Sequence, residues 1–228
     1  MNSNANILRK QAGFTLVEIA IVLVIIGLLL GGVLKGQEMI ENARIKSVVG
    51  DMNGVAAAYN SYLDRYHALP GDETAATLTA RGWLGTASGN GNGVLLITPA
   101  QTFTNGGEQA AMWRSLRAAG MAAGDPAAPA TVAGLPKAGT GGTIGVSLTT
   151  YGFAQPAICV SGLSTKQATG VDVAIDGPLP ATNIGNNIGT ARGDTGAANP
   201  LAPTAAVPTG TAYNEATVVN PWTMCRSM

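Results

Sequence analysis

Glu18 is the one charged side chain in an apolar run that extends from Phe14 to Leu34. A carboxylate inside a bilayer costs roughly 2.5–3.5 kcal/mol on insertion scales and usually needs a partner. The run holds 21 residues, which make about 30 Å of helix, enough to cross the hydrocarbon core of a membrane. The sequence therefore predicts a transmembrane helix in which Glu18 needs a partner.

The basic flank, the length of the run and the residues after it distinguish a secretory signal peptide from a membrane anchor. Arg9 and Lys10 form a short basic flank, which the positive-inside rule keeps in the cytoplasm. A secretory signal peptide has an apolar core of about 7–15 residues followed by an A-x-A-like cleavage site. Here the core is longer and no such site follows it closely. A plain membrane anchor fits the length and the flank, but it leaves Glu18 without an explanation.

The hexapeptide G-F-T-L-V-E, from Gly13 to Glu18, resembles the processing site of type IV pilin and type II secretion pseudopilin precursors. The resemblance implies that a prepilin peptidase cuts after Gly13 and that Phe14 becomes an N-methylated amino terminus. Glu18 then occupies the family's acidic position, the fifth residue of the mature chain. Its carboxylate would neutralise the Phe14 ammonium of a neighbouring subunit in apolar surroundings. An ordinary membrane anchor is the alternative.

The same resemblance implies a place and partners for the chain. The precursor would wait in bacterial inner-membrane lipid with its head in the periplasm. Inner-membrane assembly machinery would then pack it with itself and other pilin-like subunits into a type IV pilus, as a structural subunit. Two alternatives stay open: a type II secretion pseudopilin in a periplasmic pseudopilus, and a single-pass inner-membrane protein with a periplasmic ligand-binding head.

Composition argues against other classes of function. Charged residues make up 11% of the chain, with 13 bases against 13 acids, so no strongly basic face is expected and nucleic acid is not an indicated partner. The single histidine, His67, is more typical of a surface or capping residue than of a catalytic base. The sequence contains no C-x-x-C, G-x-S-x-G or H-E-x-x-H motif, so no catalytic residue and no enzyme activity is predicted.

The glycine- and asparagine-rich stretch 88–93, S-G-N-G-N-G, reads as a surface loop. A phosphate-binding P-loop would need Lys-Ser/Thr after its last glycine, where Val94 stands instead. Calcium needs several carboxylates, and Asp72, Asn90 and Asn92 are weak candidate ligands. No cofactor is expected, with calcium as the less favoured alternative.

A second apolar stripe follows the membrane-length run and keeps helical spacing as far as Tyr66, before Leu69-Pro70-Gly71. One helix from Phe14 to Tyr66 is therefore predicted, apolar all round in its first half and amphipathic in its second. The predicted parts of the chain are a leader peptide (1–13), a transmembrane or filament-core half-helix (14–36), an amphipathic half-helix (37–68) and a globular head (69–228).

The head is predicted to be α+β, with an antiparallel sheet packed on the long helix in a pilin-like arrangement. The segment Leu163–Asp176 fits a helix or a strand, and its likeness to a family pattern slightly favours helix. The other expected elements are helices at Glu73–Arg81 and Glu108–Ala119, strands at Val94–Ile97, Thr143–Phe153, Ala157–Val160 and Ala216–Val219, and loops at Asp125–Gly142 and Asn183–Gly210.

Cys159 and Cys225 both follow the apolar run. Two cysteines in an exported domain predict one disulfide, whereas in a cytosolic protein two buried thiols would be expected. A Cys159–Cys225 bridge would enclose 65 residues, a loop whose closure is worth about 4 kcal/mol in the chain-entropy model. It would resemble the C-terminal disulfide-bounded region of type IV pilins.

Overall fold

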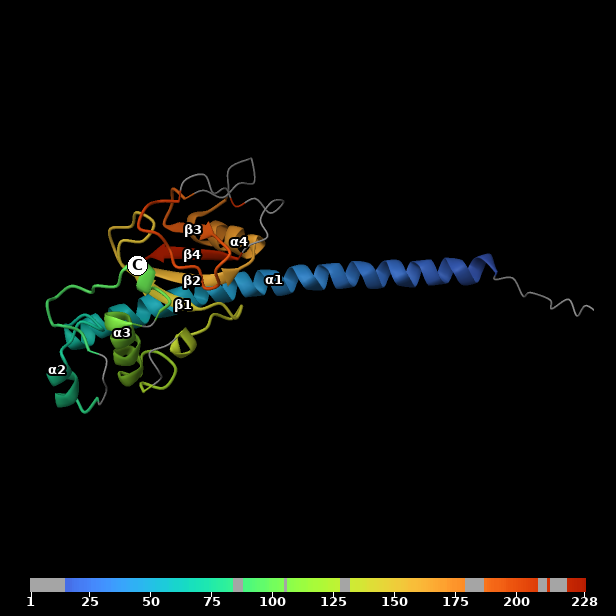
Figure 1. Ribbon diagram of the computed structural model, residues 1–228. Coiled ribbons are helices and arrows are strands. Elements are labelled where there is room, and N and C mark those ends of the chain that lie inside the picture. Colours follow the sequence, from blue (N-terminus) through green and yellow to red (C-terminus); the bar gives the residue numbers. More distant parts are fainter. Residues whose placement is uncertain are drawn as a thin grey trace, which may run out of the picture. The chain divides into compact units, whose positions relative to one another are not determined.

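The protein is described by a computed structural model that covers residues 15–83, 88–104, 106–127, 132–178, 187–208, 213 and 221–228. The chain divides into two compact units, residues 1–41 and 42–228. The elements, in chain order (Figure 1), are α1 Leu16–Tyr66, α2 Ala75–Ala80, η1 Pro99–Gln101, α3 Gly107–Ala118, η2 Val132–Gly134, β1 Ile144–Ser147, β2 Ala157–Leu163, α4 Thr165–Asp176, β3 Ala191–Thr195 and β4 Trp222–Ser227.

The C-terminal half of α1 packs on the sheet of the head, as the amphipathic stripe predicts. Within the head, one face of α1 is buried, and its buried residues recur at helical spacing: Val48, Met52, Ala58, Tyr59 and Tyr62. They join a single core with side chains from β1, β2, α4 and β4. The predicted α+β architecture, a long helix on an antiparallel sheet, is therefore confirmed.

The sheet has four antiparallel strands in the order β1-β2-β4-β3. β1 and β2 are neighbours in the chain and form an antiparallel hairpin, with Val146 opposite Ile158. The C-terminal strand β4 lies between β2 and β3, so the last strand of the chain is central in the sheet, and β1 and β3 form its two edges (Figure 1). A bulge interrupts the β2–β4 pairing between Val160 and Leu163.

The prediction of one long loop at Asn183–Gly210 is wrong for Ala191–Thr195, which forms the edge strand β3. Its sequence, A-R-G-D-T, carries no apolar alternation that could have identified it. The strand expected at Ala216–Val219 lies outside the described residues, and β4 begins later, at Trp222.

The segment Val94–Ile97 is not a strand, although its side chains alternate. Leu95 and Ile97 are buried while Val94 and Leu96 are exposed, so the period of two is real. The segment lies beside the sheet without a backbone ladder: the Ile97 carbonyl accepts the Leu148 N–H at 2.8 Å. The alternating pattern correctly indicated which side chains are buried, but it did not determine whether the backbone pairs with a neighbouring strand.

The ambiguous segment Leu163–Asp176 is helix α4. Ser164 and Gln167 form a capping box, in which the Gln167 N–H donates to the Ser164 hydroxyl at 3.2 Å and the Ser164 N–H donates to the Gln167 side chain at 3.0 Å. Gly170, which weakens the helix by propensity, allows α4 to approach α1: a Cβ there would lie 2.3 Å from the Ile45 side chain.

The stretch Asp125–Gly142, expected to be an exposed linker or loop, joins the core in its second part. Leu135 and Ala138 are buried, and Lys137 pairs with Thr143 as an isolated β-bridge. The expectation of an exposed segment is therefore wrong for Leu135 and Ala138, which belong to the core, whereas Lys137, Gly139 and Gly141 are exposed.

Candidate functional site

The first described turn of α1 places Thr15 and Glu18 in contact. The backbone N–H of Thr15 donates to Glu18 Oε2 at 2.8 Å, and the Thr15 hydroxyl donates to the same oxygen at 2.9 Å. In return, the Glu18 N–H donates to Thr15 Oγ1 at 3.3 Å. This is a capping box, a reciprocal pair that satisfies N–H groups at the start of a helix.

The capping box fixes where the predicted assembly carboxylate lies. Gly13 and Phe14, the predicted cleavage and N-methylation positions, are outside the described residues. Thr15 follows Phe14 in the sequence, so the Glu18 carboxylate lies at the helix end from which the mature chain would begin. An anion there is also stabilised by the positive end of the helix dipole.

The N-terminal unit of α1 has an apolar surface. Its side chains are exposed on every face, from Leu16, 91% exposed, to Leu34, 66% exposed. By length and composition the helix could cross a membrane. After Glu18, the next charged residue in the sequence is Lys35. It is exposed and forms an ion pair with Glu38 at 2.7 Å. The expected transmembrane segment, Phe14 to Leu34, thus falls on α1 from Leu16 to Leu34, while Phe14 lies outside the described residues.

The side-chain oxygens of the three weak calcium candidates, Asp72, Asn90 and Asn92, accept hydrogen bonds from backbone N–H groups of residues 91–94. The Asp72 carboxylate accepts backbone N–H groups from Gly91 at 3.0 Å, Asn92 at 3.1 Å and Gly93 at 2.8 Å. The side chains of Asn90 and Asn92 each accept an N–H two residues further on, at 2.9 Å. Over the described part of the chain, no three His, Cys, Asp or Glu side chains gather into a metal-binding group.

A partly buried ion pair lies beside the C-terminal end of α1, and the sequence did not predict it. Glu73 is 7% exposed and meets Arg81 with Oε1 2.6 Å from Nη2. The hydroxyl of Tyr62 also donates to Glu73. Burial, and then the Glu73 carboxylate, raise the pKa of Tyr62 above its ordinary value. The Arg81 guanidinium stacks 4.5 Å from the centre of the Tyr66 ring, so this cluster is a structural clamp.

His67 ends α1. Its backbone has φ of 50°, and its N–H donates to the Leu63 carbonyl at 2.9 Å. The residue is exposed, and its geometry is that of a helix C-cap.

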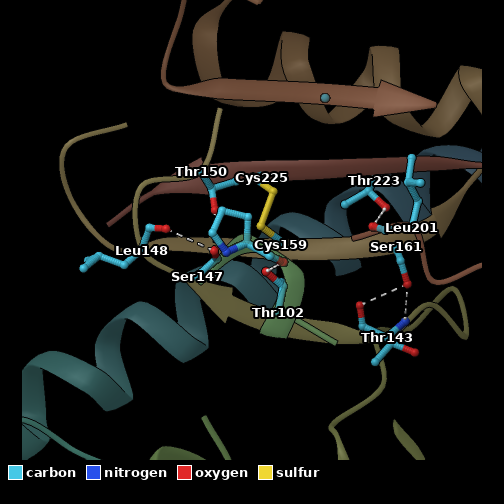
Figure 2. Close-up of a disulfide and its surroundings, with 12 residues drawn as sticks. Thr102, Thr143, Ser147, Leu148, Thr150, Cys159, Ser161, Leu201, Thr223 and Cys225 are labelled. Atoms are coloured by element: carbon cyan, nitrogen blue, oxygen red, sulfur yellow. Dashed lines mark hydrogen bonds between the residues drawn. A yellow bond between two sulfur atoms is a disulfide. The ribbon is translucent and has the colours of Figure 1, made fainter. Parts of the chain in front are cut away.

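Cys159 and Cys225 form a disulfide across the centre of the sheet (Figure 2). They are register partners on the neighbouring strands β2 and β4, with Cα atoms 4.0 Å apart. Both are fully buried, and they are 66 positions apart in the sequence. The bridge therefore closes a loop that contains α4 and β3 and ties the C-terminal strand to the β1–β2 hairpin.

Comparison with known families adds a result for the N-terminal segment. Residues 8–34 match the prokaryotic N-terminal methylation motif, which is characteristic of type IV pilin and pseudopilin precursors. The match covers the basic flank, Gly13, Phe14, Glu18 and the apolar run. Searches of curated proteins and of solved structures found no match.

Proposed function

We propose that this chain, whose N-terminus carries the methylation motif of type IV pilin and pseudopilin precursors, is a structural subunit of a type IV pilus-like filament. The observation that carries the proposal is the match over residues 8–34. In this proposal prepilin peptidase cleaves after Gly13, and the new amino terminus at Phe14 is N-methylated.

The capping box supports a docking role for Glu18. Its carboxylate already accepts two hydrogen bonds at the start of α1, so it is a charged acceptor held at the end of an apolar helix. A second subunit's Phe14 ammonium is a complementary cation, and in apolar surroundings each charge needs the other. Glu18 would then select the axial position at which two helices pack.

The head supports an exported location. A disulfide persists in oxidising compartments, and the Cys159–Cys225 bridge lies in the C-terminal part of the head. The basic flank at Arg9 and Lys10 would stay in the cytoplasm by the positive-inside rule. The precursor would therefore be held in the inner membrane with its head in the periplasm until the assembly machinery packs it into a filament.

Mass spectrometry of the mature protein tests the processing step. A mature chain that begins with N-methylated Phe14 is the expected result. A chain that keeps its first 13 residues would refute the proposal and favour an ordinary single-pass membrane protein.

The cellular location of the assembled chain distinguishes a pilus subunit from a secretion pseudopilin. Filaments sheared from the cell surface should contain this chain if it is a pilus subunit. Retention in the periplasmic fraction, together with a processed amino terminus, would instead identify a type II secretion pseudopilin.

A further inference from the structure

The head contains a polar hollow of about 390 Å³ that the processing and assembly steps do not use. It is lined by residues of the turn between Lys137 and Thr143, by Gly162 in β2, and by Asn199 and Pro200. Three segments far apart in the sequence therefore form it, and all of them belong to the unit 42–228. The hollow lies beside the Thr143–Ser161 hydrogen bonds shown in Figure 2.

Two glycines allow the segments that line the hollow to approach one another closely. A Cβ at Gly142 would lie 2.0 Å from the Ser161 carbonyl oxygen. Gly162 sits in the β2 bulge with φ of 73°, and a Cβ there would lie 3.2 Å from the Asn199 side-chain oxygen. Bulges occur often beside binding sites, because the extra residue interrupts the ladder and redirects the strand.

Lys137 brings a positive charge to this hollow. Its ammonium donates to the Thr143 hydroxyl at 2.6 Å, which occupies one of its three N–H groups. No carboxylate lies within ion-pair distance of it in the described ranges. The Asp51 carboxylate, on α1 beside the turn, accepts the Gly139 N–H at 2.9 Å, so that acid is already held by the backbone.

Thr140, which also lines the hollow, contributes a buried hydroxyl group. Its hydroxyl oxygen is buried and has no hydrogen-bond partner among the residues that the structure describes. A buried polar group without a partner is costly, and such atoms call for an explanation. Asn199 supplies a side-chain amide from the opposite segment. The lining thus carries one ammonium, two threonine hydroxyls and one amide, and it carries no acid.

We propose that this hollow binds a small oxyanion, either a carboxylate or a phosphate group, through Lys137, Thr140 and Asn199. The ammonium supplies the charge, and a charge-assisted hydrogen bond is roughly twice as strong as a neutral one. The Thr140 hydroxyl and the Asn199 amide donate to the remaining anion oxygens. The proposal is independent of filament assembly, because every residue in it belongs to the head.

The test is a titration of the full-length protein in non-ionic detergent with inorganic phosphate and, separately, with acetate. Binding is measured by calorimetry and by NMR of the lysine ammonium groups. Saturable binding of at least one anion to wild type is expected, and Lys137→Gln should weaken it by about tenfold or more. Phosphate alone, or acetate alone, would identify which of the two groups the hollow accepts.

Lys166→Gln is the matched control, since Lys166 is an exposed lysine on α4 outside the hollow. It should leave the affinity unchanged. Thr140→Val keeps every charge and should weaken binding several-fold while thermal unfolding stays as in wild type. Equal losses in Lys137→Gln and Lys166→Gln would show general charge attraction and overturn the proposal, as would the absence of saturable binding of both anions.

Discussion

Thr15 and Glu18 are joined by a reciprocal capping box, in which the carboxylate of Glu18 accepts both the N–H and the hydroxyl of Thr15. Glu18 thus has a local role in the single chain besides its proposed role between subunits. The two roles can be separated, because the cap needs both side chains and the docking needs only the carboxylate.

We predict that Glu18→Ala is still cleaved after Gly13 but assembles poorly, because no carboxylate remains for the Phe14 ammonium of the next subunit. Thr15→Ala removes only the cap, at a cost of about 1 kcal/mol to the end of the helix, and should still assemble. Immunoblots for processing, and quantified sheared filaments, measure the two steps. Normal filaments from Glu18→Ala would refute the docking role, and equal defects in both variants would assign the effect to the cap.

The Cys159–Cys225 bridge should dominate the stability of the head. Replacing both cysteines by alanine opens a loop of 65 intervening residues, and the chain-entropy model predicts a loss of about 4 kcal/mol in the free energy of unfolding. Trp222, fully buried on β4, provides a fluorescence signal for denaturant titration of the full-length protein in detergent. An unchanged unfolding midpoint would contradict this account.

The exposed edge of the sheet is blocked by side chains along β3. The N–H groups of Ala191 and Gly193 donate to Asp176 and Asn187, each at 2.8 Å. Unpaired edge groups are templates for pairing with another chain, and natural proteins cover them.

We therefore predict that the double variant Asp176→Ala, Asn187→Ala self-associates through β3. Light scattering and size-exclusion chromatography of the detergent-solubilised protein should show concentration-dependent oligomers that wild type lacks. Asp64→Ala, at an exposed acid of α1, matches the change in charge and should stay as wild type. A double variant that keeps the wild-type size would show that the edge is protected by other means.

The buried tyrosines predict a loss of stability at high pH. Tyr151 is fully buried, and its hydroxyl has no hydrogen-bond partner in the described part of the head. Burial, followed by the charge of Asp194, raises its pKa above the ordinary value of 10.0. Above about pH 10 the unfolded chain releases this proton while the folded chain keeps it, so the free energy of unfolding falls as pH rises.

Tyr151→Phe should remove the contribution of Tyr151 to this dependence, because it deletes the titrating hydroxyl without deleting a hydrogen bond. The slope of unfolding free energy against pH above pH 10 should become shallower by up to about 1.4 kcal/mol per pH unit. Urea unfolding at pH 8 and at pH 11 measures the slope. The prediction fails if wild type and Tyr151→Phe lose stability in parallel.

Elements built from local signals were predicted well. The helix predicted at Glu108–Ala119 is α3, Gly107–Ala118, and the short helix predicted at Glu73–Arg81 contains α2, Ala75–Ala80. Helical periodicity and caps act between residues three or four positions apart, so the sequence carries them directly. The β1–β2 hairpin is similar, because its two strands are neighbours in the chain.

The elements that were missed depend on distant partners. β3 contains the polar and small residues A-R-G-D-T and is a strand because β4 pairs with it, with Gly193 opposite Met224. The clamp of Glu73 and Arg81 against Tyr62 joins residues that no short motif relates. In each case the environment, rather than intrinsic propensity, selected the structure.

The sequence by itself determined the N-terminal part of this protein: a methylation motif at residues 8–34, an acid at Glu18, and a helix long enough to cross a membrane. Those properties depend on composition and on spacings of a few residues, so they can be recognised without knowledge of the tertiary structure. The tertiary structure alone decided the order of the strands, the position of the disulfide between β2 and β4, and the hollow around Lys137. Each of these joins segments far apart in the chain, and only packing brings such segments together.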